Sequence, residues 1–394
     1  MAAIVPVVLG KKHVSAPIIY LIIGAAAFLV IGYYDIHPLD QLEEIQHITE
    51  FVVLVALANA GLRIKSPFAW NTWKNAVRLL AIAMPITILA AVYLGWQFLA
   101  LAPATAVLFG ALISPTDPVL ASELQTSEPG EPDDSKSKLG LTAEAGINDG
   151  LAFPFTWLAV FIAKEGTDFT QWWHRWLLHD LLLKTAIGVA VGLASGWLLY
   201  KMVFSISSKN ETLSRISRGI LSLSVILLPY ALAEVIGGYG FLSVFFAACM
   251  FSNYEKHQEH MNSLHDFNEE LESFAVAVIF ITIGIFIAMH YRMLTDWPVM
   301  AVAALLVLVV RPAAGYLSLI GTKLNRLQRF ALAFYGIRGI GSVFYLAFAL
   351  TEADFEQPKK LIEVTTATIF ISVVIHGVTA RWIHKKIEKH DSEQ

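Results

Sequence analysis

The sequence predicts an all-α polytopic membrane protein that crosses the bilayer about 12 or 13 times. Hydrophobic residues make up 56% of the 394 residues, charged residues make up only 15%, and the mean hydropathy is +0.60. A soluble domain carries roughly a quarter of charged residues, so this chain has too few to cover a surface that faces water. The composition therefore excludes an ordinary soluble enzyme.

Apolar stretches bounded by Pro, Gly or charge clusters supply the membrane spans, since a helix needs about 20 residues to cross a hydrocarbon core of about 30 Å. They lie near residues 17–33, 48–62, 76–95, 98–121, 140–163, 181–204, 218–235, 239–252, 271–290, 297–320, 329–350 and 361–383. A further apolar segment, Met1–Leu9, is too short to span alone. The connecting loops are too short to form a soluble domain, so the chemistry must lie at membrane depth.

The charges of the loops predict the orientation. With the 10–16 loop inside, 20 of the 28 Lys and Arg residues fall on the cytoplasmic side, six fall outside, and Arg311 and Arg338 lie within spans. Cytoplasmic loops carry such an excess of positive charge. We therefore predict a multi-pass protein of the inner cell membrane with a cytoplasmic C-terminus, of which 384–394 form a short tail.

Several classes of partner and cofactor are excluded or not expected. A formal charge of −4 without a basic run argues against nucleic acid. The single cysteine, Cys249, rules out a disulfide framework or a cysteine-based metal site. No phosphate loop, nucleotide fingerprint or zinc-protease motif occurs. We expect no cofactor and no enzymatic activity.

Two prolines interrupt the fourth span around Asp117. Residues 114–118 read Ser-Pro-Thr-Asp-Pro, and two prolines three residues apart do not fit one regular helix. Backbone at membrane depth unwinds only where it is buried in protein or lines a cavity. We expect a broken helix with Thr116 and Asp117 beside an ion site. The alternative is a proline kink in which Asp117 only caps the second half-helix.

The next span carries three polar residues, Glu144, Asn148 and Asp149. Glu144 and Asn148 share a helix face, whereas Asp149 is rotated about 100° further round. A buried Glu144 needs a cation, and Arg311 is the natural partner. Asp149 is then left unpaired, and a buried carboxylate without a partner binds both protons and desolvated monovalent cations near physiological pH. The alternative for Asp149 is a purely structural buried acid.

A second span is interrupted by glycines around Arg338, within residues 336–341. Arg338 is placed to neutralise half-helix dipole ends where two broken spans cross. The alternative is an arginine that snorkels to the cytoplasmic boundary.

With these residues in place, the sequence resembles the monovalent cation–proton antiporter 1 family, the NhaP-like sodium/proton antiporters. The resemblance runs from about residue 17 to 383. Its most specific part is Asn148-Asp149 after Glu144, together with Thr116-Asp117-Pro118 upstream, and Arg311 and Arg338 complete the pattern.

The resemblance implies an NhaA/NhaP-like fold with inverted repeats and two crossing broken helices, in a homodimer. Residues 1–75 and 205–296 would form the dimerisation or scaffold domain, and 76–204 and 297–383 the ion-transporting core. The function implied is exchange of a monovalent cation, Na⁺ first with Li⁺ or K⁺ as alternatives, for a proton by elevator-type alternating access.

The resemblance also assigns roles to residues. Asp149 would be the shared proton and cation carboxylate, and Asn148 would mark electroneutral one-for-one exchange. Asp117 would support the site and Thr116 would offer its backbone carbonyl. Glu144 and Arg311 would form a structural ion pair.

Two departures from the family pattern affect the ion ligands. Ala145 stands where relatives often have a serine, and Asn59, an auxiliary position, aligns with an acid of the relatives. Both remove cation ligands, and a less charged cage would favour K⁺, which costs less to dehydrate.

Two other readings stay open at this point. The first is an uncoupled cation channel or a transceptor. The more remote one is an intramembrane aspartyl protease, because Asp117 and Asp149 are two membrane-depth aspartates, although neither lies in the dipeptide context of such proteases.

Three histidines mark the polar segment 252–270, namely His257, His260 and His265. We expect this segment to be a solvated cytoplasmic loop, with a pH sensor as the alternative because His titrates between pH 5 and 8.

Overall fold

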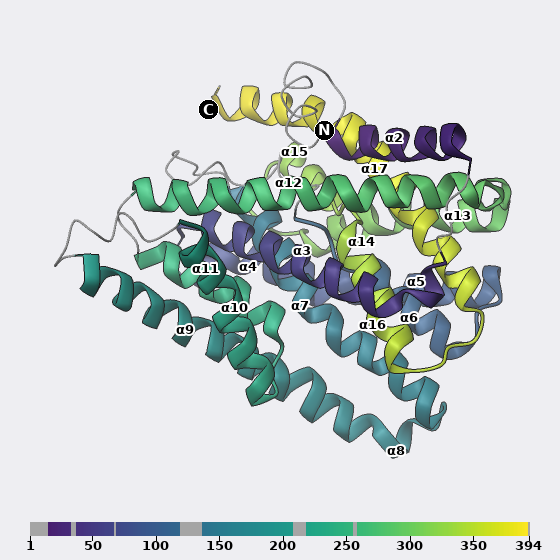
Figure 1. The fold of residues 1–394 in the computed structure, drawn as a ribbon, viewed down its shortest axis with the longest axis horizontal. Coiled ribbons are helices and arrows are strands. Elements are labelled where there is room, and N and C mark those ends of the chain that lie inside the picture. Colours follow the sequence, from purple (N-terminus) through teal and green to yellow (C-terminus); the bar gives the residue numbers. More distant parts are fainter. Residues whose placement is uncertain are drawn as a thin grey trace.

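The computed structural model describes residues 15–32, 37–66, 68–118, 136–207, 218–254 and 258–392. Within these ranges all regular structure is helical (Figure 1). Eight helical segments of the described residues are long and apolar enough to cross a membrane, and four shorter apolar helices accompany them. All twelve predicted apolar stretches contain helix, which confirms the predicted all-α class. The Met1–Leu9 segment lies outside the described residues.

The α-helices follow one another with short connections. In chain order they are α2 (Ala16–Ile31), α3 (Leu42–Arg63), α4 (Trp70–Arg78), α5 (Met84–Leu99), α6 (Pro103–Ile113), α7 (Lys136–Glu165), α8 (Phe169–His174), α9 (Lys184–Ser207), α10 (Arg218–Ile236), α11 (Gly240–Tyr254), α12 (Gln258–Met289), α13 (Trp297–Leu305), α14 (Arg311–Ser318), α15 (Arg326–Phe334), α16 (Ile340–Glu352) and α17 (Pro358–Ser392).

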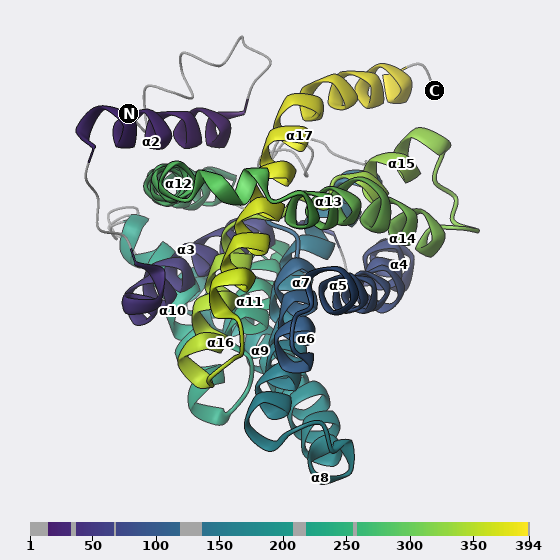
Figure 2. The ribbon, with the colours of Figure 1, turned by 90° about the vertical axis from the view of Figure 1, so that its right-hand side faces the viewer.

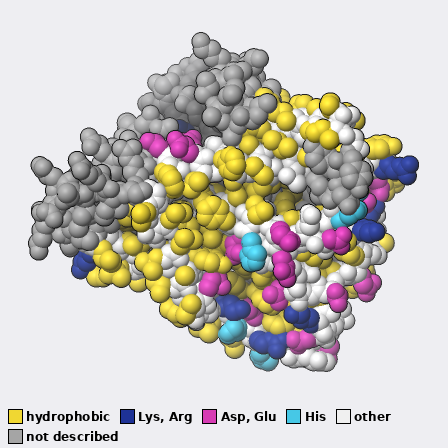
Figure 3. Space-filling view, in the orientation of Figure 1, with side chains coloured by type: hydrophobic (Ala, Val, Ile, Leu, Met, Phe, Trp, Pro, Cys, Tyr) yellow, Lys and Arg dark blue, Asp and Glu magenta, His cyan; other side chains and the backbone are white. Residues whose placement is uncertain are grey.

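Large apolar side chains cover much of the outer surface. Leu89 is 68% exposed and Val235 is 86% exposed, and many others resemble them. Figure 3 shows a broad band of hydrophobic side chains, while charged side chains and histidines gather at the lower right of the same face. Contiguous apolar surface of this extent is stable only against lipid. The chain is therefore a multi-pass membrane protein.

Two parts of the chain share one unusual local pattern. In each, nine α-helical residues lead into five π-helical residues, at Leu79–Ala83 and Leu306–Val310. A proline then stands at the second position of the next helix, Pro85 in α5 and Pro312 in α14. Proline has no N–H to offer the preceding turn, so the helix widens just before it. In this repeated pattern Arg311, the first residue of α14, corresponds to Met84, the first residue of α5.

The helices that carry the candidate residues pack together at the centre of the molecule. Helix α16 packs against α3, α6 and α7, and α6 also contacts α17 (Figure 2). Helix α12 lies along α2 and α3, whereas α9 packs mainly against α10 and α11. The polar centre is thus enclosed by apolar helices on all described sides.

Candidate functional site

Helix α6 ends at Ile113, and residues 114–118 leave the helical conformation. Pro115 and Pro118 explain the break, because neither can donate the hydrogen bond that a continuing helix needs. The five residues are buried, and the N–H of Asp117 donates to the carbonyl of Ile337 at 2.7 Å. The unwound segment is therefore held by protein at this depth, as backbone in a membrane requires.

A second unwound segment, residues 335–339, separates α15 from α16. Helix α15 begins with a capping box in which Asn325 and Gln328 bond each other's backbone N–H. At the other end Gly336 and Gly339 frame Arg338, whose backbone N–H donates to Ser372 Oγ at 2.9 Å. The break thus sits between a well-defined helix start and an anchor on α17.

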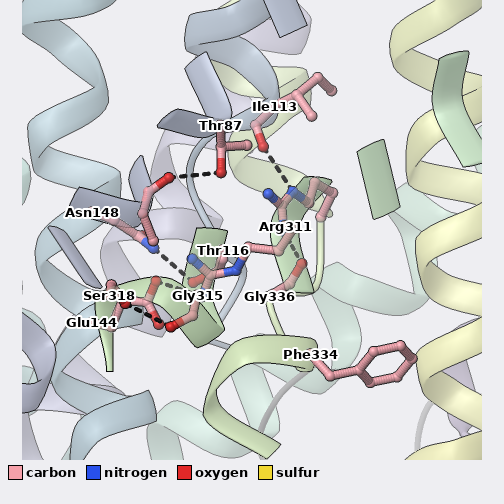
Figure 4. A network of polar contacts seen from close by, with 12 residues as sticks. Thr87, Ile113, Thr116, Glu144, Asn148, Arg311, Gly315, Ser318, Phe334 and Gly336 are labelled. Atoms are coloured by element: carbon pink, nitrogen blue, oxygen red, sulfur yellow. Dashed lines mark hydrogen bonds and ion pairs between the residues drawn. The ribbon is translucent and has the colours of Figure 1, made fainter. Parts of the chain in front are cut away.

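The two unwound segments cap each other's helices. Asp117 Oδ2 accepts from the N–H of Ile340 at the start of α16, at 2.7 Å. Arg338 Nε donates to the carbonyl of Ile113 at the end of α6, also at 2.7 Å, and its Nη1 donates to Gly336; Figure 4 shows these two carbonyls. A negative charge at a helix N-terminus and a positive charge at a helix C-terminus both interact favourably with the helix dipole. The contact between the two unwound segments is therefore stabilised by two buried charges.

Glu144 and Arg311 form a buried ion pair. Arg311 Nη2 donates to Glu144 Oε1 at 2.6 Å, and both side chains are 2% exposed. Gly336 leaves room for it, because a Cβ there would lie 2.3 Å from Arg311 Nε and 2.6 Å from Arg338 Nη1. Two buried charges in such contact compensate each other's loss of hydration. The pair engages one oxygen of Glu144, and the other oxygen, Oε2, is buried without a hydrogen-bond partner.

Asn148 is oriented by the first unwound segment. Its Nδ2 donates to Thr116 Oγ1 at 2.7 Å, and Figure 4 shows the two side chains pointing toward each other. Because the amide nitrogen is engaged, the carbonyl Oδ1 faces elsewhere, and this buried atom has no hydrogen-bond partner. An oxygen ligand is thus left open beside the break.

Among the described residues Asp149 is a buried acid without an ion-pair partner, whereas Glu144 is paired with Arg311. Its side chain is buried, and Oδ1 has no hydrogen-bond partner. Gly341 of α16 makes room for it, since a Cβ there would lie 3.1 Å from Asp149 Oδ1. The Tyr345 hydroxyl donates to the backbone carbonyl of Asp149 and not to its carboxylate. Asp117 acts on Asp149 electrostatically. The Asp149 side chain is thus buried with one oxygen open.

The two departures from the family pattern, Ala145 and Asn59, lie on different helices. Ala145 is buried on α7 and supplies no oxygen ligand, as expected from its side chain. Asn59 lies on α3, where its Nδ2 donates to Glu272 Oε2 at 2.7 Å. A carboxylate is therefore present beside Asn59, but it comes from α12.

Glu272 is the residue that the sequence interpretation missed. It follows Glu269 and Glu270 at the edge of the predicted 271–290 span, where acids usually face water. The signal that reveals it is helical spacing: α12 begins at Gln258, so residues 265, 268, 269 and 272 share one face. This face meets α3.

The predicted loop at 252–270 is wrong over most of its length. Residues 258–270 belong to α12, and His265 is 1% exposed. Arg63 Nε donates to His265 Nε2 at 2.9 Å, and this packing against α3 explains the burial. His257 lies outside the described residues, as does the side chain of His260.

Metal centres of the ordinary kind are absent from the residues that the structure describes. No group of three or more His, Cys, Asp or Glu side chains converges there.

The comparison with protein families decides the identity of the chain. The family model described as "Sodium/hydrogen exchanger, transmembrane" matches residues 1–386. The chain belongs to the sodium/hydrogen exchanger family. This is a family of transporters rather than enzymes, so the prediction of a non-enzymatic transporter is confirmed, and the remote protease reading loses its support.

Individual relatives of this chain are distant. It is 23% identical over 340 residues to the K(+)/H(+) antiporter NhaP2 of Shewanella oneidensis, a match covering 84% of this chain and 56% of that protein. It is 23% identical over 409 residues to the Na(+)/H(+) antiporter NhaG of Bacillus atrophaeus, covering all of this chain and 74% of that protein. The chain thus spans little more than half the length of the NhaP2 relative.

A solved structure shares the fold. The sodium proton antiporter MjNhaP1 of Methanocaldococcus jannaschii matches with a TM-score of 0.74 and 21% identity, over 98% of this chain and 95% of that one. The chain therefore has the predicted NhaP-like fold.

Proposed function

We propose that the protein exchanges a monovalent cation for a proton, with Asp149 as the carboxylate that both ions share. The observation that carries this proposal is the open Oδ1 of a buried Asp149 next to the crossing of two broken helices. A proton and a cation cannot occupy one carboxylate together. Each ion therefore displaces the other, and that competition couples their movements.

The neighbouring oxygens supply the remaining ligands. Asn148 Oδ1 is buried and open, and the Thr116 backbone carbonyl lies in the unwound segment. Unwound carbonyls and side-chain oxygens replace the hydration shell of an alkali ion at membrane depth. Asp117 and Arg338 keep the segments in place, and the Glu144–Arg311 pair fixes α7 against α14.

The exchange we propose is electroneutral. Asn148 is neutral, so the site presents one free carboxylate, which releases one proton when it takes one cation. Na⁺ is the first candidate, with Li⁺ and K⁺ as alternatives. The named relatives include a K⁺/H⁺ and a Na⁺/H⁺ antiporter, and the absence of a hydroxyl at Ala145 favours an ion that is easily dehydrated.

Alternating access would follow from movement of one group of helices against another. As in the division expected from the sequence, we assign residues 76–204 and 297–383 to the moving core, and 1–75 and 205–296 to the scaffold of a homodimer. Helix α9 falls within the core range of this division, but it packs on α10 and α11, so we assign it to the scaffold instead. The protein would lie in the inner cell membrane with its C-terminus in the cytoplasm, as the loop charges predict.

The test is transport by purified protein in proteoliposomes with an imposed pH gradient. Adding Na⁺, Li⁺ or K⁺ should dissipate the gradient with wild type but not with Asp149→Asn, which keeps the shape of the side chain and removes its charge. The order of the three ions gives the selectivity, and insensitivity to membrane potential gives the one-for-one stoichiometry. Cation flux without proton movement would indicate the channel reading instead.

A further inference from the structure

A second buried carboxylate, Glu272, lies at the contact between α12 and α3. Its Oε2 accepts from Asn59 Nδ2 at 2.7 Å. The residue is 9% exposed, and Asn59 is 3% exposed. Among the residues described, the structure gives Glu272 no ion pair, although Arg63, Asp117 and Glu269 act on it electrostatically. A membrane-depth acid of this kind is costly, and such acids mark ion pathways.

The oxygen of Asn59 is open on the same side. Because Nδ2 bonds Glu272, the carbonyl Oδ1 is turned away from that bond, and this buried atom has no hydrogen-bond partner. An unpartnered buried carbonyl oxygen costs free energy unless something satisfies it. A carboxylate and an amide carbonyl are both oxygen ligands of the kind that hard cations bind.

Asp117 connects this pair to the proposed transport site. Asp117 acts electrostatically on both Asp149 and Glu272. Helix α3, which carries Asn59, packs against α7, which carries Asp149, and against α16. The contact between α3 and α12 that holds Glu272 is thus joined to the proposed transport site through α3.

A purely structural hydrogen bond explains less of this arrangement. Glutamine at position 272 would accept the same bond from Asn59 without placing a charge in the membrane. The chain instead carries a carboxylate with an open amide oxygen beside it.

We propose that Glu272 and Asn59 Oδ1 form a second cation-binding position on the scaffold, which captures the monovalent cation from the side of Arg63 before it reaches Asp149. This inference rests on the proposed cation/proton exchange. The cation passes from Glu272 along Asp117 to Asp149, where it displaces the proton. The position raises the local concentration of the cation without taking part in the exchange of the proton.

The first test is Glu272→Gln in the proteoliposome assay. Glutamine keeps the bond from Asn59 and removes only the charge. We expect the KM for the cation to rise about tenfold, equivalent to about 1.4 kcal/mol, while the maximal rate stays within about twofold. Glu269→Gln is the matched control, one turn earlier on α12 with a side chain that is 53% exposed. A KM unchanged in Glu272→Gln, or raised equally in Glu269→Gln, overturns the proposal.

The second test moves the carboxylate across the contact. In Asn59→Glu combined with Glu272→Gln, the acid stands on α3 and an amide on α12, with the bond between them retained. We expect the KM to return to within about threefold of wild type. A double variant as weak as Glu272→Gln alone would mean that the charge at this place is not what binds the cation.

A binding measurement separates this proposal from the failure of exchange itself. In detergent, Asp149→Asn should keep part of the thermal stabilisation given by the transported cation, and Asp149→Asn with Glu272→Gln should lose it. If wild type shows no exchange, the proposed function fails, while cation-dependent stabilisation that Glu272→Gln removes still supports the second position. Stabilisation that is equal in all variants overturns it.

Discussion

Asp117 and Asp149 lie in the same buried centre, yet their carboxylates are held in different ways. Asp117 accepts from the N–H of Ile340 and so belongs to the crossing of the two unwound segments. Asp149 is one helix away on α7, and its Oδ1 has no hydrogen-bond partner. Both residues were conspicuous in the sequence for the same reason, which is charge within an apolar span.

The difference teaches that burial alone does not identify an ion-binding acid. An acid that accepts a hydrogen bond from a backbone N–H holds the neighbouring segments in place, because its charge already interacts with a helix N-terminus. An acid with an open oxygen and no ion-pair partner is costly to the fold and available to an ion. Three predictions test this distinction, beginning with the acid that is bound most tightly.

Glu144→Ala should cause the largest loss of stability. It leaves the Arg311 guanidinium buried without its carboxylate partner, and breaking a buried ion pair in this way costs about 3–5 kcal/mol. Unfolding in mixed micelles measures the loss. Glu144→Met combined with Arg311→Met should recover most of it, because no uncompensated charge remains. A single variant as stable as wild type would show that the pair does not stabilise this protein.

Asp117→Ala should lower the stability of the folded protein, whereas Asp149→Ala should not. The first removes the acceptor for the Ile340 N–H and should cost about 1–3 kcal/mol. The second removes a buried carboxylate with an open oxygen, so stability should stay the same or rise. Melting temperatures of the two variants, in detergent and at one ionic strength, make the comparison. Equal destabilisation would remove the distinction between the two acids.

Ser342→Ala should have the smallest effect. The Ser342 hydroxyl donates to the carbonyl of Leu112 at 2.7 Å, next to the last residue of α6. Losing this bond should cost about 1 kcal/mol and leave the KM for the cation unchanged. Thr156→Ala is a suitable control, because its hydroxyl donates only within α7, to Ala152. A change in cation affinity from Ser342→Ala would indicate that the crossing is less rigid than its other bonds imply.

The sequence predicted the membrane class, the twelve apolar stretches and the two breaks. These features depend on local properties: apolar length, proline without an amide N–H, and glycine without a side chain. It also singled out Glu144, Asp149 and Arg338, because a charge in an apolar span is visible in one dimension.

The sequence alone could not reveal which groups meet. Glu272 is 213 residues from Asn59, and it follows two acids at a span edge, so it resembled a solvated residue. His265 was misread for the same reason. The predicted apolar stretch starts only near residue 271, whereas α12 already begins at Gln258.

Local sequence by itself thus determined where the chain is helical, where it breaks and which charges the membrane must accommodate. Only the tertiary structure decided that Asp117 caps α16, that Arg338 caps α6 and that one oxygen of Asp149 stays open. The physical reason is that hydrogen bonds and ion pairs depend on distances of about 3 Å, which side chains far apart in the chain reach only after the helices pack.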